Sequence, residues 1–191
     1  MRNREGSAKG FSLVELVVVV AVILVLIAVA MPSFLVAFRS YQLSGAAIQV
    51  ADVVSSTRFE AIRLNKQINC LIQLTGSSTQ MWADSNRDGI AQSSEKQILL
   101  SGNLNLAPAG SVPNTAGLAA AIGVTVLTAV STTNGAIAFD ARGALNPAGV
   151  YVLYVFNSAV PSAGYRAVIL LPTGSIQIWA ADNAGNWHEV N

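Results

Sequence analysis

Three oxygen-bearing side chains alternate along one stretch of the sequence, at Asp84, Asn86 and Asp88. Gly89 follows them, and Glu95 stands at the twelfth position counted from Asp84. This pattern satisfies the bare EF-hand expression, in which alternating oxygens, a glycine turn and a closing carboxylate bind calcium. The flanking residues indicate strands instead of helices, the eighth position is a small alanine, and Asn-Arg-Asp-Gly is itself a good hairpin turn. The pattern therefore favours a structural turn, with a calcium site as the alternative.

Other residues that could perform chemistry are few. His188 is the only histidine and stands near the end of the chain beside Trp187, which predicts an exposed tail residue and not a base. The sequence has no HExxH, GxSxG, glycine-rich phosphate loop or Cys/His cluster. Trp82, Trp179 and Trp187 could form a ligand patch, but scattered aromatic residues in a β domain usually belong to its core or edges. Cys70 is the only cysteine, so it cannot form an internal disulfide. We expect no catalytic residues, no cofactor and no enzyme.

The N-terminus combines a basic leader with a long apolar segment. Three cations, Arg2, Arg4 and Lys9, precede an apolar run over residues 16–31, and the next cation is Arg39. At ~1.5 Å per residue, a helix over residues 11–38 is long enough to cross a hydrocarbon core of about 30 Å. Cations in the short leading flank predict that this flank lies in the cytoplasm and that the remainder of the chain faces outward.

Residues 9–16, Lys-Gly-Phe-Ser-Leu-Val-Glu-Leu, with the apolar run after them, resemble the class III signal of type IV prepilins and type II secretion pseudopilins. The resemblance covers about the first 38 residues. It implies that a prepilin peptidase cleaves after Gly10 and methylates the new N-terminal amine of Phe11. It also implies that Glu15 pairs with the N-terminal amine of a neighbouring subunit, and that Pro32 marks where the helix bends or melts in a filament.

Each of these features has a simpler interpretation. Ser12-x-x-Glu15 is also a capping box that closes the first helical turn, and Pro32 could be a plain kink at a membrane boundary. Residues 28–30, Ala-Val-Ala, form an A-x-A site, and cleavage after Ala30 by an ordinary signal peptidase would release a soluble protein. Against this alternative stand the carboxylate of Glu15 and the apolar character that continues after the supposed cleavage point.

From Arg39 onward the sequence is helical and amphipathic. One apolar face repeats every seven residues, and Glu60 and Arg63 are spaced to form an ion pair. The apolar face comprises Leu43, Val50, Thr57 and Leu64, with Ala47, Val54 and Ala61 beside them. We predict one helix over residues 11–65, whose second half packs on a sheet. Short strands follow at 68–74, 79–83, 96–100, 124–130, 135–139, 150–156, 165–171 and 175–181, with a loop over 110–123.

The C-terminal half narrows the resemblance. Residues 139–143, Phe-Asp-Ala-Arg-Gly, resemble the Phe-Asp-x-x-Gly turn of the GspH/FimT group of minor pseudopilins, and residues 172–174, Pro-Thr-Gly, resemble its later turn. Some members of the group bind DNA for uptake through arginines that follow this last glycine. Here Gly174 is followed by Ser-Ile-Gln-Ile, without a cation. The leader carries a net charge of +2, so removing it from the formal net charge of +1 leaves −1, and a nearly neutral chain argues against nucleic-acid binding.

We therefore predict an α+β fold in which a long N-terminal helix packs on an antiparallel β domain. The predicted parts are a leader (1–10), a transmembrane and assembly helix (11–38), its amphipathic continuation (39–66) and a periplasmic β domain (67–191). The predicted function is that of a minor pilin-like subunit near the tip of a type IV pilus or type II secretion pseudopilus. Its partners would be the prepilin peptidase, other pilins and the bacterial inner membrane. A calcium-binding pilin, a DNA-uptake pilin and a soluble secreted protein are the alternatives.

Overall fold

The computed structural model describes residues 11–190 and confirms the predicted α+β class. One long helix, α1 (Leu13–Leu64), precedes a series of short strands. The chain divides into two compact units, Met1–Ala37 and Phe38–Asn191. The first described unit consists of the beginning of α1, and the second contains the remainder of the helix and all of the strands.

Local hydrogen bonds and backbone conformation define both ends of helix α1. Ser12 precedes the first turn, and its hydroxyl accepts a hydrogen bond from the backbone N–H of Glu15. At the other end, Asn65 adopts a left-handed conformation with φ 48°, and the N–H of Lys66 donates to the carbonyl of Ala61. The observed bounds therefore agree with the predicted helix over 11–65 to within two residues.

The second half of α1 presents a buried stripe to the β domain. The repeat of small and branched residues produces this stripe because positions three and four apart share one helix face. Its members are Leu43, Ala46, Ala47, Val50, Val53, Val54, Thr57 and Ala61. The prediction that Leu64 belongs to this face is wrong, because Leu64 is exposed in the last turn of the helix. The predicted ion pair between Glu60 and Arg63 is confirmed at 2.7 Å.

Two sheets form the β domain. The first has the order β3-β2-β1-β6, and all of its neighbouring strands are antiparallel. Its members are β1 (Ile68–Thr75), β2 (Ser78–Asp84), β3 (Gln97–Leu100) and β6 (Asn134–Phe139). Strand β1 lies inside the sheet and pairs with both β2 and β6, so it joins the first hairpin to a strand about sixty residues later.

The second sheet has the order β10-β9-β8-β7-β4, with the short strand β5 also paired to β7. The β5–β7 pairing is parallel, which the prediction of a purely antiparallel domain missed. The second sheet consists of β4 (Leu104–Ala107), β5 (Thr128–Ala129), β7 (Tyr151–Asn157), β8 (Tyr165–Leu170), β9 (Ile176–Ala181) and β10 (Trp187–Glu189).

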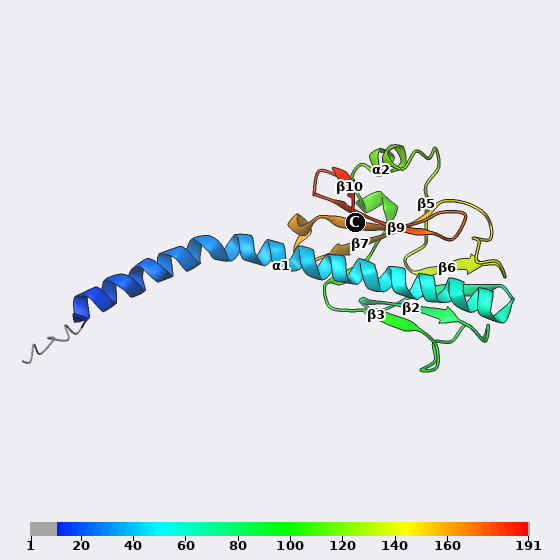
Figure 1. Ribbon diagram of the computed structural model, residues 1–191, viewed down its shortest axis with the longest axis horizontal. Helices are drawn as coiled ribbons and strands as arrows, with labels where there is room; N and C mark the ends of the chain where they lie inside the picture. The colour runs from blue at the N-terminus through cyan, green and yellow to red at the C-terminus, as the bar shows by residue number, and fades with distance from the viewer. Residues whose placement is uncertain (1–10, 191) are drawn as a thin grey trace, which may run out of the picture. The chain divides into compact units, whose positions relative to one another are not determined.

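Alternation along β7 and β8 divides the interior into two clusters. Leu153 and Val155 join the larger cluster, which contains the buried stripe of α1 and residues of both sheets. Val152 and Tyr154 face the opposite side and join the smaller cluster, which includes Leu118 of helix α2 (Thr115–Ala121). Figure 1 shows β2 and β3 on one side of the second half of α1, with β7, β9 and α2 on the other.

Four elements differ from the sequence prediction. The segment predicted as a loop over 110–123 contains helix α2, and the strand predicted over 124–130 is reduced to β5. Strands β4 and β10 were not predicted at all. Helix α2 forms because the Asn114 side chain accepts a hydrogen bond from Gly117 N–H and an alanine-rich stretch follows.

Candidate functional site

The first turn of α1 holds the residues that the sequence singles out for processing and assembly. Phe11 is the first described residue, and the predicted cleavage partner Gly10 lies outside the described residues. Ser12 Oγ accepts from the backbone N–H of Glu15 at 3.1 Å, and the Ser12 carbonyl accepts from Leu16 N–H at 3.1 Å. One half of the predicted capping box is thus formed. The carboxylate of Glu15 stands in the first turn, where the helix dipole favours a negative charge.

Every side chain from residue 11 to residue 37 is exposed in this structure, although most are apolar. An 18-residue window of α1 has a mean hydropathy of 3.3, so this helix is long and apolar enough to cross a membrane. A continuous apolar surface of this size requires lipid or other helices around it. Helix α1 is therefore a candidate membrane span.

Pro32 lies inside α1 without ending it. Proline has no backbone N–H, so the carbonyl of Ala28 loses its usual partner four residues ahead. The helix is nevertheless assigned through this position in the structure. The hypothesis that Pro32 is where the helix bends or melts in a filament stays a prediction.

Two turns that are distant in the sequence meet on the second half of α1. The Phe-Asp-x-x-Gly turn is closed by Asp140, whose Oδ1 accepts from the N–H groups of Arg142 and Ala144, each at 2.9 Å. Arg58 of α1 donates from Nε to the carbonyl of Gly143 at 3.0 Å. A Cβ built on Gly174 would lie 2.1 Å from that same carbonyl oxygen. Only glycine fits at this point of the second turn.

This three-part contact, formed by Arg58, Gly143 and Gly174, gives a structural role to both sequence motifs. Both glycines have positive φ, 76° and 80°, which side chains rarely adopt. Arg58 could not be singled out from the sequence, because an arginine on an amphipathic helix is indistinguishable there from an ordinary solvated residue. Its partners are separated from it by more than eighty residues.

A second arginine attaches the β domain to α1. Arg166 of β8 is 7% exposed, and its Nε donates to Ser44 Oγ at 3.1 Å. Its Nη2 donates to Ser40 Oγ at 2.7 Å, and its Nη1 donates to the carbonyl of Tyr165 at 2.9 Å. Burial lowers the pKa of the Arg166 guanidinium because the charged form is poorly solvated there.

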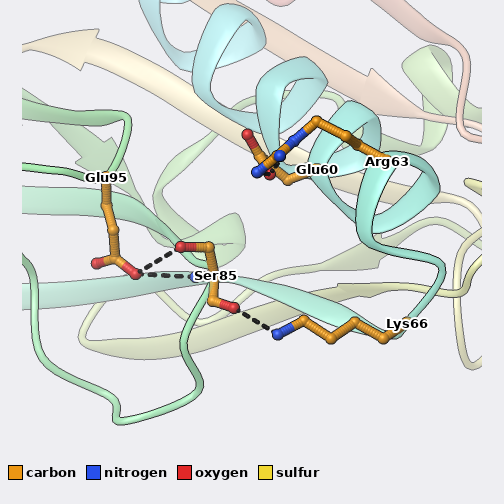
Figure 2. A network of polar contacts seen from close by, with 5 residues as sticks. All are labelled: Glu60, Arg63, Lys66, Ser85 and Glu95. Carbon is orange, nitrogen blue, oxygen red and sulfur yellow. Dashed lines mark hydrogen bonds and ion pairs between the residues drawn. The ribbon is translucent and has the colours of Figure 1, made fainter.

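The loop that satisfies the calcium pattern is closed by its own hydrogen bonds. Asp84 Oδ1 accepts from Asp88 N–H at 3.1 Å, and Glu95 Oε1 accepts from the N–H and hydroxyl of Ser85 at 2.8 and 3.2 Å. Lys66 donates to the Ser85 carbonyl at 2.9 Å. Figure 2 shows this chain from Lys66 through Ser85 to Glu95, with the Glu60–Arg63 ion pair nearby.

The predicted ligands therefore act as hydrogen-bond acceptors within the loop. Asn86 and Asp88 also bond to each other, through Nδ2 and Oδ2 at 2.8 Å. Within residues 11–190, no group of three or more His, Cys, Asp or Glu side chains is placed to hold a metal ion. These hydrogen bonds close the loop as a turn, and the calcium alternative stays a prediction.

The other residues considered for chemistry are distributed over both sheets. His188 is exposed on the edge strand β10. Cys70 is buried under α1, and burial raises the pKa of its thiol to about 12. Trp82 is buried on the first sheet, whereas Trp187 packs against Tyr154 of the second sheet with ring centroids 6.0 Å apart. Trp179 and Trp187 lie on the paired strands β9 and β10 and pack on the smaller cluster, whereas Trp82 lies on the other sheet, so the structure does not bring all three tryptophans together.

Comparison with known proteins identifies the N-terminal motif and the fold. Residues 6–31 match the family model of the prokaryotic N-terminal methylation motif. The type IV minor pilin FimU of Pseudomonas aeruginosa has a similar crystal structure, with a TM-score of 0.51 and 14% identity over 75% of this chain and 96% of FimU. A second crystal form of FimU gives a TM-score of 0.49 and 15% identity, over 74% and 99% of the two chains. No curated protein matches the sequence significantly.

Proposed function

We propose that this protein, whose fold is that of a type IV pilin, is a minor structural subunit of a type IV pilus or type II secretion pseudopilus. One observation carries the proposal: a methylation motif is joined to an apolar helix that continues into the core of a pilin-like domain. A protein built in this way needs no substrate or cofactor. Its role is to place a folded domain on a helix that can pack beside other helices.

The proposed route begins in the bacterial inner membrane. The apolar part of α1 spans the membrane once, with the basic leader in the cytoplasm and the β domain in the periplasm. A prepilin peptidase cleaves between Gly10 and Phe11 and methylates Phe11. The subunit then leaves the membrane for a filament of other pilins or pseudopilins, at or near its tip.

Glu15 has two candidate roles that separate variants can distinguish. As a capping residue, it acts within its own helix, and glutamine could replace it. As an assembly residue, it uses its negative charge to pair with the positively charged amine of Phe11 in a neighbouring subunit, and glutamine could not replace it. We propose the assembly role, because the Glu15 side chain is exposed and therefore accessible to the amine of a neighbouring subunit.

The first experiment is the mass of the N-terminal peptide of the protein extracted from its native membranes. A peptide that begins with N-methylated Phe11 is the expected result. A peptide that begins at Met31 would mean that an ordinary signal peptidase cleaves after Ala30, and the anchored-subunit proposal would be abandoned.

The second experiment measures incorporation into sheared filaments by immunoblot. Glu15→Gln should be processed normally but lost from filaments, because it keeps the shape of the side chain and removes its charge. Ser12→Ala is the matched control, since it removes the cap and keeps the carboxylate. Equal incorporation of Glu15→Gln and the unmodified protein would refute the assembly role of Glu15.

A further inference from the structure

A groove of about 680 Å³ lies within the Phe38–Asn191 unit. It is bordered by residues 38–49 of α1 and by the connection from β3 to β4. Amide and hydroxyl side chains line one part of it, including Gln42, Ser44 and Asn103. Tyr41 and Leu99 line another part and are 78% and 60% exposed. The groove thus has both polar and apolar lining, and its most buried lining residues are Ala46, Leu100 and Asn157.

The charge of this groove is positive and uncompensated. Among the described residues that line it, Arg39 alone is charged, and its Nη1 donates to the neutral Gln42 Oε1 at 3.0 Å. Arg166 stands behind it, bonded to the groove residue Ser44. In the described part of the chain, the two ion pairs are Arg63–Glu60 and Lys96–Asp52, so neither arginine has a carboxylate partner. Arg39 is partly exposed, so its guanidinium is accessible to an anion in the groove, which would supply the missing counter-charge.

The covalent chain places this groove at the end of the apolar segment. Arg39 is two residues after Ala37, so their Cα atoms are at most about 8 Å apart in any orientation of the two units. The run from Leu16 to Phe38 contains no charged residue and would be ~34 Å long as a helix, close to the ~30 Å hydrocarbon core. Arg39 is therefore expected at the depth of the lipid head groups.

We propose that the groove binds the phosphate of an anionic membrane phospholipid through Arg39 while the subunit is held in the membrane. This inference rests on the membrane anchoring in the proposed function. The guanidinium of Arg39 donates to the phosphate oxygens, and the amide and hydroxyl groups beside it supply further donors. Tyr41 and Leu99 contact the glycerol and the first part of the acyl chains, and an exposed tyrosine is typical of a membrane interface.

The test uses the full-length protein in nanodiscs that contain phosphatidylcholine with or without phosphatidylglycerol. Native mass spectrometry after release measures the share of protein that retains one phosphatidylglycerol. We expect retention by the unmodified protein and by Arg39→Lys, and about a tenfold loss of affinity in Arg39→Gln, as for a lost charge-assisted hydrogen bond. Arg142→Gln, which removes an exposed charge at the other end of the domain, is the matched control and should retain the lipid.

Three results would overturn the lipid site. These are equal retention by Arg39→Gln, equal retention of phosphatidylcholine, and full competition by inorganic phosphate, which would indicate a general anion site. A photoreactive benzophenone residue at Leu99 gives a second readout. Its crosslinking to lipid supports the proposal, whereas crosslinking only to another pilin would assign the groove to filament contacts. Whether the protein stays with vesicles after an alkaline carbonate wash tests anchoring separately, so failure of the anchor and failure of the lipid site give different results.

Discussion

The contact between the two turns on α1 makes a strong quantitative prediction, for the substitution Gly174→Ala. The added Cβ would lie 2.1 Å from the Gly143 carbonyl oxygen and 2.7 Å from Arg58 Nε. The left-handed backbone at φ 80° costs ~1–2 kcal/mol for alanine. Separating the turns also breaks the hydrogen bond from Arg58 to Gly143, which contributes about 1 kcal/mol. Together with the overlap itself, we expect a loss of ~3–4 kcal/mol in the free energy of unfolding.

Gly76→Ala is the matched control, because Gly76 has φ 63° and nothing lies within 4 Å of its added Cβ. Gly76→Ala should lower the free energy of unfolding only by the ~1–2 kcal/mol that the left-handed backbone costs alanine. The two variants should therefore differ by about 2 kcal/mol, or ~4–8 °C in Tm for a chain of this size. Tryptophan fluorescence of the full-length protein in detergent is the assay, since all three tryptophans lie in the Phe38–Asn191 unit.

Equal Tm values for Gly174→Ala and Gly76→Ala would refute the idea that the two turns must touch. A further check combines Gly174→Ala with Arg58→Met. Both changes remove the same contact, so the double variant should lose less stability than the sum of the single variants. Strict additivity would mean that Arg58 and Gly174 act independently.

Three further predictions follow from other parts of the β domain. Burial raises the pKa of Cys70 from 9.0 and that of Tyr154 from 10.0, each to about 12, so the folded state holds protons that the unfolded state releases. The contribution of these two groups to the free energy of unfolding should be fully present below about pH 9 and be lost between pH 9 and about pH 12. Unfolding curves measured at alkaline pH should show this loss, which should be less steep in Cys70→Ala. Glu95→Gln should lower the free energy of unfolding by ~1–2 kcal/mol, because it weakens the acceptor of the Ser85 donors. Calcium and chelator should leave the Tm of this variant and of the unmodified protein unchanged. A rise in Tm with calcium would restore the metal-site interpretation. Asp52→Asn should change the free energy of unfolding, measured by chemical denaturation, by less than ~1 kcal/mol, because the Asp52–Lys96 pair is half exposed. A larger loss would show that this pair anchors β3 to α1.

The sequence predicted the elements whose signals are local. The limits of α1, the first hairpin and strands β7 to β9 follow from periodicity and from the turn residues that bound them. Strand β4 was missed because its four residues lack β-branched side chains and offer too short an alternation to recognise. Helix α2 was missed because Pro113 and Gly117 indicate a loop. Its capping residue Asn114 is held in a left-handed conformation by distant contacts, a hydrogen bond to the Gly185 carbonyl and another from Trp187 Nε1.

The candidate site likewise combines contacts that sequence spacing predicts with contacts that only the folded structure reveals. Ser12 and Glu15 are three residues apart, so their cap can be predicted from spacing alone. The contact of Arg58 with two turns, and that of Arg166 with Ser40 and Ser44, depend on how the sheets close on the helix, which spacing does not reveal. The motif glycines could be recognised by resemblance, but the reason for each glycine became visible only in the packed structure.

The buried stripe of α1 has a consequence for the order of folding. Part of its cover comes late in the chain: Arg58 bonds to Gly143, 85 residues further along, and Ser40 bonds to Arg166, 126 residues further along. Contacts of such separation form slowly. Strands β1 to β3 follow the helix directly, but until β7 and β8 have emerged the stripe from Leu43 to Ala61 is only partly covered. A partly covered amphipathic helix next to a candidate membrane span is expected to bind the bilayer surface. We therefore expect the nascent chain to rest on the membrane through this helix and to lift away only when its sheets close.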